Sequence, residues 1–255
     1  MDIRSAPRLG LVVPPENPTA EPEFSRFLGS GMHFHTTRFP VLPGKGLREM
    51  LDTYNEVLPG VLAGFGMLPL DAAVVACSAS HYLLSPDGDR AFCAGLSERA
   101  GFPVLSSSLA TLAACEALGV TRLTLVSPYE PWLTGLSRDY WEKAGLTVDG
   151  VVPVPAGDRY DPYRVTTRTL LDRIRRHDVP EDTTLLFTGT GMFTLAALDE
   201  LGGRHPDRVM LTSNLASAWW ALRTAGAAQD GGPGGHPQLK RLAGAAAARE
   251  EHAHA

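Results

Sequence analysis

The sequence predicts an α/β fold with parallel sheets and two similar halves. Short apolar runs rich in branched residues alternate with longer amphipathic stretches along most of the chain. Such runs are typical of strands buried on both faces, and strands that alternate with helices form parallel sheets. Residues 71–80 read as a strand, small polar residues and a turn into a helix, and residues 183–194 have the same build. This weak internal repeat predicts two halves with a similar fold.

The apolar runs are predicted as buried parallel strands because they are short and rich in branched residues. In chain order they are 9–13, 32–38, 71–77, 121–127, 148–154, 183–188 and 208–212. The repeat continues in segments 104–108 and 209–213, because each is predicted to be a strand that ends in small hydroxylated residues.

The amphipathic stretches between these strands are predicted as helices. The first, 46–64, places Leu47, Met50 and Leu51 on one face together with Tyr54 and Leu58, which is the spacing of a helix that covers a sheet. The others are 89–100, 109–118, 131–144, 162–177, 192–201 and 216–224.

Two similar halves would turn the C-terminal ends of their strands toward one cleft, where ligands of open α/β sheets bind. We assign residues 1–105 plus 213–228 to the first half and 106–212 to the second. Residues 229–255 are predicted to be a flexible tail, because 230–235 has the Gly- and Pro-rich composition of a linker.

Composition and charge narrow the classes of function. The 255 residues carry 23 Lys and Arg against 28 Asp and Glu, a net charge of −5, which argues against a nucleic-acid-binding face. Three cysteines are too few for a disulfide framework and indicate a reduced, cytoplasmic protein. No signal peptide and no apolar run near the ~20 residues of a membrane span is expected.

Cys77 is the candidate nucleophile or acid. It ends a strongly apolar strand and precedes small residues, whereas Cys93 and Cys115 lie in predicted helices and are interpreted as core. His81 follows Cys77 by four residues, so the two side chains would share a face if a helix begins at once. The alternative for His81 is a polar residue at the rim of the cleft.

Further candidates lie at other strand ends. Thr190 lies between Gly189 and Gly191, and its hydroxyl and the neighbouring N–H groups suit an oxyanion. Asn17 follows the first strand, where it either binds a ligand or makes a turn. Two more residues have a functional and a structural interpretation: Arg38 as a carboxylate clamp or a surface ion pair, and Tyr129 as an anion donor or a cap on the core.

The order and spacing of these motifs resemble the aspartate/glutamate racemase superfamily, in the branch of the maleate cis–trans isomerases and arylmalonate decarboxylases. The resemblance covers roughly residues 8 to 226 and rests on RLGLVVP at 8–14 with Asn17 and Thr19, VACS at 75–78, SSS at 106–108, LGVTR at 118–122 and SPY at 127–129.

This resemblance implies two flavodoxin-like halves with the active site between them, no cofactor, no metal, and a small carboxylate as the substrate. By motif match Cys77 is catalytic. The implied carboxylate-binding residues are Asn17, Ser78, Tyr129, Thr190 and Gly191. Nucleic acid and membrane partners are not expected, and a homo-oligomer is left open.

The chain departs from the family at its second cysteine, because Gly189 stands in that place. With one thiol, a two-base racemase ranks low, as does a non-catalytic carboxylate-binding protein. A cis–trans isomerase of a maleate-like dicarboxylate, with Cys77 as the nucleophile, is placed first. The alternative is a decarboxylase of a malonate-type acid, with Cys77 as the proton donor to an enediolate.

Overall fold

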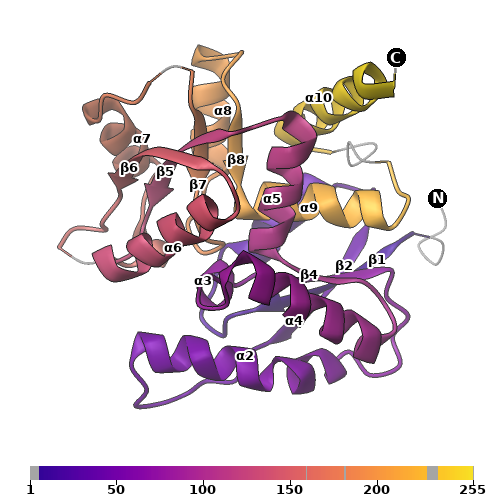
Figure 1. Cartoon of the computed structure of the whole chain (residues 1–255). Helices are drawn as coiled ribbons and strands as arrows, with labels where there is room; N and C mark the ends of the chain where they lie inside the picture. The colour runs from indigo at the N-terminus through magenta and orange to yellow at the C-terminus, as the bar shows by residue number, and fades with distance from the viewer. Residues whose placement is uncertain (1–5, 159, 181, 229–234, 255) are drawn as a thin grey trace.

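The computed structural model describes residues 6–158, 160–180, 182–228 and 235–254. Its centre is two four-stranded sheets, ordered β2-β1-β3-β4 and β6-β5-β7-β8, and every pairing is parallel (Figure 1). The strands are β1 (Arg8–Val13), β2 (His33–Arg38), β3 (Ala72–Val75), β4 (Val104–Ser106), β5 (Arg122–Ser127), β6 (Thr147–Pro153), β7 (Thr184–Phe187) and β8 (Met210–Thr212). The equivalent order of the two sheets confirms the predicted α/β fold with pseudo-symmetric halves.

Helices flank both sheets. They are α1 (Ala20–Leu28), α2 (Leu47–Ala63), α3 (Ser78–Tyr82), α4 (Ser85–Ala100), α5 (Ser107–Leu118), α6 (Pro131–Lys143), α7 (Thr167–Arg176), α8 (Leu195–Arg204), α9 (Ser213–Thr224) and α10 (Pro237–His254), with a 3-10 turn at η1 (Pro162–Arg164). The short helices α1 and α3 were not predicted, and the predicted helix 162–177 is divided into η1 and α7. Thr166 separates the two, because its hydroxyl accepts the Thr169 N–H and caps α7.

The two halves repeat one local device at the end of a strand. Ser106 at the end of β4 accepts the Leu109 N–H at 3.0 Å and so caps α5. Thr212 at the end of β8 accepts the Leu215 N–H at 3.0 Å and caps α9. A hydroxyl cap satisfies a backbone N–H that the first turn of a helix leaves free. The two capped helices pack against each other, and α9 also contacts β3 and α1.

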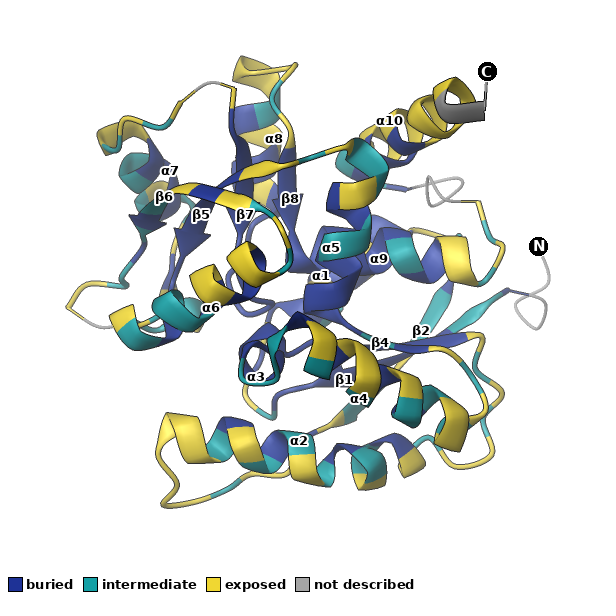
Figure 2. Ribbon diagram, viewed as in Figure 1, coloured by how far each residue is buried: buried dark blue, intermediate teal, exposed yellow. Residues whose placement is uncertain are grey.

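The core lies between the sheets and their helices, where the inner strands β3 and β7 are buried on both faces, whereas the edge strand β2 is only partly buried (Figure 2). Val74 and Val75 of β3 and Leu185 and Leu186 of β7 have no exposed surface. Continuous burial explains why these strands read as unbroken apolar runs. Within the described part of the chain, no helix combines the length and apolar character that a membrane span needs.

The predicted flexible tail at 229–255 requires correction. Residues 237–254 form α10, which packs on α5 and α9. Leu239 is fully buried and Leu242 is 5% exposed, so the helix is attached by apolar contacts. The linker segment 229–234 and residue 255 lie outside the described residues.

Candidate active site

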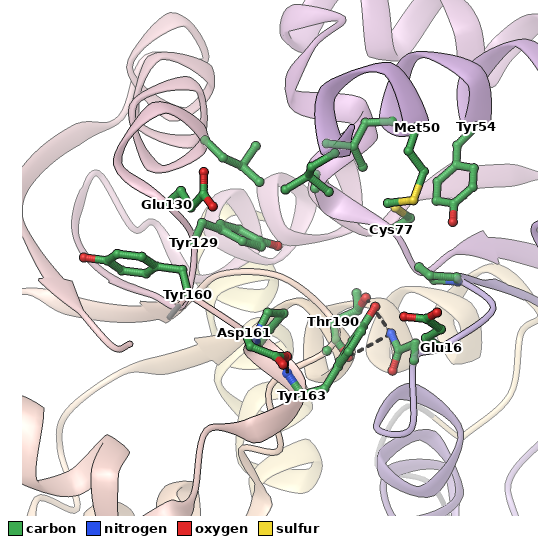
Figure 3. Close-up of a pocket in the computed structure, with 18 of the residues that line it drawn as sticks. Glu16, Met50, Tyr54, Cys77, Tyr129, Glu130, Tyr160, Asp161, Tyr163 and Thr190 are labelled. Carbon is green, nitrogen blue, oxygen red and sulfur yellow. Dashed lines mark hydrogen bonds between the residues drawn. The ribbon is translucent and has the colours of Figure 1, made fainter. Parts of the chain in front are cut away.

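A cavity of about 970 Å³ lies at the C-terminal ends of the strands and is lined by both halves. The segments that follow β1, β3, β5 and β7 all contribute to its wall, as a ligand site of an open parallel sheet requires. Figure 3 shows Cys77 on one side and Tyr129 on the other, with the tyrosine hydroxyl directed toward the interior. The sequence-predicted residues Asn17, Cys77, Ser78, Tyr129, Thr190 and Gly191 all line this cavity.

Cys77 directly precedes α3, makes no capping hydrogen bond with its side chain, and is 4% exposed. Burial raises the pKa of its thiol, and contacts with Ser80 oppose this shift only in part. No described residue that lines the cavity carries a positive charge, whereas Glu16 and Asp158 contribute carboxylates to the lining. No described cation of the wall therefore favours a thiolate, and the raised pKa favours the neutral thiol.

The other two cysteines lie outside the cavity wall. Cys93 is buried in α4 and Cys115 in α5, as the sequence predicted. Burial raises the pKa of both thiols, that of Cys115 to about 12. Cys77 is the one of the three that faces the site.

Asn17 and Thr190 join the two halves beside Cys77. The Asn17 amide donates to the Thr190 carbonyl at 3.3 Å and to its hydroxyl at 3.2 Å, and Figure 3 draws both bonds. Thr190 in turn donates to the carbonyl of Ala76 at 2.7 Å, directly before Cys77. A second bond of this kind runs from the Thr19 hydroxyl to the Gly191 carbonyl at 2.7 Å. The polar residues at the ends of β1, β3 and β7 thus form one bonded unit.

Ser78 belongs to a cluster of hydroxyls behind Cys77. Its Oγ lies 2.8 Å from that of Ser107 and donates to that of Ser213 at 3.2 Å. Both partners lie at helix starts that follow a strand, so the cluster joins β3, β4 and β8. Ser78 is 1% exposed and belongs to the residues that line the cavity.

Tyr129 and Gly189 lie against each other on the far side of the cavity. Gly189 has a positive φ of 85°, and a Cβ added to it would come within 2.8 Å of Cζ of Tyr129 and still closer to the hydroxyl. No described residue forms a hydrogen bond with that hydroxyl, so it can donate to a ligand. Burial raises the pKa of Tyr129 well above 10.0, which keeps the phenol protonated.

The structure does not bring His81 to the cavity wall. Its ring is fully buried, and Nδ1 lies 2.7 Å from Oδ1 of Asp89. Ser106 and Tyr140 donate to the other oxygen of Asp89, each at 2.7 Å. The predicted shared face with Cys77 fails because Cys77 precedes α3 with the non-helical angles φ −144° and ψ 78°, whereas His81 lies within the helix and bonds to Asp89 of α4.

A group of three metal-ligand types is present in this buried network. One ligand atom each of His81, Asp89 and Cys93 lies within 4.8 Å of the others. Both oxygens of Asp89, however, already accept hydrogen bonds from neighbouring side chains. The arrangement is a buried polar network that joins α3, α4, β4 and α6; the Asp89 oxygens are satisfied in it, whereas Nε2 of His81 has no partner among the described residues.

Arg38 supports the site from outside the cavity wall. Its guanidinium donates to the carbonyls of Pro14, Pro15 and Asn17 and forms an ion pair with Glu21. Of the two interpretations of Arg38, the structure shows the ion pair and not the carboxylate clamp, because the guanidinium is occupied by Glu21 and by the backbone of the 14–17 loop. This contact fixes the loop that carries Asn17.

Sequence reasoning missed several lining residues, among them Glu16, Tyr54 and Tyr163. Tyr54 lay on the apolar face of the predicted helix 46–64 and was read as core. The ring of Tyr163 lies over Gly191, where a Cβ would come within 2.5 Å of it. Such contacts join segments far apart in the chain and leave no local signal.

Comparison with known proteins agrees with this geometry. A family model described as arylmalonate decarboxylase matches residues 9–238. An arylmalonate decarboxylase of Bordetella bronchiseptica is 27% identical over 249 residues, which cover 92% of this chain and 97% of that protein. A maleate isomerase of Geobacillus stearothermophilus is 25% identical over 213 residues, covering 76% of this chain and 84% of the relative.

Solved structures show the same fold. The maleate isomerase of Pseudomonas putida superposes with a TM-score of 0.79 at 19% identity, over 89% of this chain and 99% of the other. A cysteine-to-serine mutant of the Nocardia farcinica maleate cis–trans isomerase, with a covalently bound succinylcysteine intermediate, gives 0.76 at 22% identity over 92% and 99%.

Fold and site define a two-sheet α/β enzyme with a cysteine between pseudo-symmetric halves. The chain belongs to the arylmalonate decarboxylase family. Its curated relatives are a decarboxylase and an isomerase.

Proposed function

We propose that this enzyme is a cofactor-independent decarboxylase of a substituted malonate-type acid, with Cys77 as the proton donor. One observation carries the proposal: the thiol that faces the cavity is buried, and no described cation or imidazole borders the cavity. Such a thiol stays protonated and suits a general acid better than a nucleophile.

The proposed step conserves atoms and charge. The bond between the α-carbon and one carboxylate breaks, CO₂ leaves, and the electron pair passes to the α-carbon as an enediolate. The remaining carboxylate oxygens are held by the Tyr129 hydroxyl and by the backbone N–H groups of the 190–191 segment, which the Asn17 amide holds in place. Cys77 gives its proton to the α-carbon, and the resulting thiolate takes a proton from water.

The cavity wall supports a substrate with a bulky apolar substituent. Leu47, Met50, Leu51 and Leu133 line it, and its volume of about 970 Å³ lies at the upper end of pockets for drug-sized ligands. An apolar wall also disfavours a charged carboxylate more than neutral CO₂, which promotes its loss.

The second candidate is a cis–trans isomerase of a maleate-like dicarboxylate. Here Cys77 adds to the double bond, rotation follows, and elimination restores the thiol. The succinylcysteine intermediate of the Nocardia farcinica enzyme, in a mutant with one cysteine replaced, supports a route in which a cysteine adds covalently to the substrate. This route begins from a thiolate, which the burial of Cys77 opposes.

Incubation in D₂O distinguishes the two reactions. The enzyme is given phenylmalonate and, separately, maleate, beside Cys115→Ala as a matched cysteine control. Release of CO₂ with one deuterium at the α-carbon of the monoacid is the expected result. Fumarate without deuterium from maleate, and no CO₂ from the malonate, would replace the proposal with the isomerase. Turnover of neither acid overturns both.

A further inference from the structure

Glu23 is a buried acid that reaches from the first half of the molecule to the second. It lies on α1, is fully buried, and accepts four hydrogen bonds from residues that follow β7 and β8. Oε1 accepts the N–H of Thr194 at 2.5 Å, its hydroxyl at 2.9 Å, and the N–H of Leu195 at 3.1 Å. The N-terminus of α8 is therefore capped by a carboxylate from the other half. A negative charge there is favoured by the positive end of the helix dipole.

Asn214 connects Glu23 to the active site. Its amide Nδ2 donates to Oε2 of Glu23 at 2.8 Å and to the carbonyl of Thr190 at 3.1 Å. Thr190 is the residue that bonds to Asn17 and to the carbonyl before Cys77. Two hydrogen bonds thus separate the Glu23 carboxylate from the loop that forms the oxyanion side of the cavity.

The burial of the Glu23 carboxyl group costs desolvation free energy. No described cation pairs with it, and burial raises the pKa of its carboxyl group, although the bonds from Asn214, Thr194 and Leu195 oppose the shift. A buried acid without an ionic partner destabilises the fold relative to an apolar residue of similar size. Its four bonds all converge on the segment between β7 and α8 and on its neighbour Asn214, so its role lies there.

We infer that Glu23 is a positioning residue, which fixes the Thr190–Gly191 segment against Cys77 so that this segment can bind the carboxylate of the substrate. The inference rests on the proposed function only in taking a carboxylate as the ligand. In Glu23→Gln, an amide N–H₂ group replaces one accepting oxygen. Either the Asn214 amide or the start of α8 then faces a donor, and the loop shifts.

The test measures carboxylate binding apart from turnover. Phenylacetate, a monoacid that the proposed decarboxylation would release, is titrated calorimetrically into the wild type, Glu23→Gln and Glu98→Gln. Glu98 is an exposed glutamate on α4 and serves as the matched control. A rise of about tenfold in Kd is expected for Glu23→Gln alone, with a similar rise in KM for the malonate and a smaller change in kcat.

A second comparison separates positioning from stability. Leu239→Ala removes a buried side chain of α10 and lowers the melting temperature without touching the cavity. If Glu23→Gln is too unstable to titrate, Asn214→Ala breaks the link to Thr190 and takes its place. Weaker binding in the Glu23 or Asn214 variant, at unchanged affinity in Leu239→Ala, supports the inference.

Unchanged affinity in Glu23→Gln overturns it, as does equal weakening in Leu239→Ala. Absence of carboxylate binding in the wild type overturns it too. Wild-type binding that depends on Glu23, with no turnover of either acid, removes the proposed function and leaves the inference standing.

Discussion

The hydroxyl of Tyr129 occupies the space where a side chain at Gly189 would begin. Residue 189 is the position at which the family resemblance expects a second cysteine. The absence of that thiol is therefore built into the packing, because phenol and thiol cannot share this space while φ of residue 189 is 85°. The cavity presents a thiol on one side and a phenol on the other.

Gly189→Ala is expected to lower stability by about 2 kcal/mol or more and to reduce turnover. The left-handed backbone alone disfavours an alanine by ~1–2 kcal/mol, and the new Cβ displaces Tyr129. Urea unfolding of a double-mutant cycle with Tyr129→Ala measures the second part. In the Tyr129→Ala background, Gly189→Ala should lower the free energy of unfolding only by the ~1–2 kcal/mol that the left-handed backbone costs. Equal losses in both backgrounds would show that the two residues do not compete for space.

Cys77 is expected to be the first cysteine that iodoacetamide modifies. It borders the cavity, whereas Cys93 and Cys115 lie inside helices against the core. Because burial raises the pKa of Cys77, its reaction should be slow at neutral pH and accelerate as pH rises. Peptide mapping by mass spectrometry gives the order of modification. Equal rates at all three cysteines would refute selective access through the cavity.

The pH dependence of turnover distinguishes an acid from a nucleophile. As a proton donor, Cys77 must be a thiol, so kcat should stay level through neutral pH and fall only as the thiol ionises. Since the pKa of Cys77 is raised above 9.0, this decline should lie on the alkaline side of that value. Initial rates from neutral pH to about 10.5 measure it. A rate that rises with pH throughout would instead indicate an attacking thiolate.

Asp89→Asn is expected to destabilise the fold by about 3 kcal/mol at neutral pH, because it removes one partner of a buried pair. Burial by itself raises the pKa of Asp89, but the His81 ring and the bonds from Ser106 and Tyr140 outweigh it and lower the pKa. An Asp carboxyl whose pKa is lowered by folding stabilises the folded state at pH values above the ordinary pKa of Asp. The loss should therefore persist from neutral pH to about 4 and shrink in stronger acid.

The matched control for Asp89→Asn lies on the same helix. Asp87 is 97% exposed and pairs with Arg90 at the surface, so Asp87→Asn should change stability by less than about 1 kcal/mol. Urea unfolding of both variants at two pH values makes the comparison. Equal losses in the two variants would show that the buried network adds nothing.

The sequence was sufficient to predict the parallel sheets and the position of Cys77 at the end of a strand, where it lines the cavity. A buried parallel strand is an unbroken apolar run, and Cys77 stands at the end of one, so both could be recognised locally. The i, i+4 spacing that paired Cys77 with His81 was misleading, because it assumes that both residues are helical, whereas Cys77 lies before α3 with φ −144° and ψ 78°. Helix α10 was missed because its Ala-rich stretch follows a Gly-rich linker and shows few apolar residues besides Leu239 and Leu242.

Contacts between the halves could not be predicted. Glu23 reaches Thr194 across 171 residues, and Asn17 reaches Thr190 across 173. Neither residue carries a local signal of its partner: Glu23 lies in a segment for which the sequence predicts no helix, and Asn17 reads as a ligand-binding or a turn residue at the end of a strand. Only the docking of the second half on the first brings their partners to them.

The role of Cys77 as the proton donor is decided by the turnover of a substituted malonate by Cys77→Ala. The variant is measured beside Cys115→Ala, with phenylacetate binding as the check that the cavity is intact. We predict a loss of at least about 100-fold for Cys77→Ala, the range of a positioned general acid, and near wild-type turnover for Cys115→Ala. Full turnover by Cys77→Ala would contradict the assignment of this thiol to the chemistry.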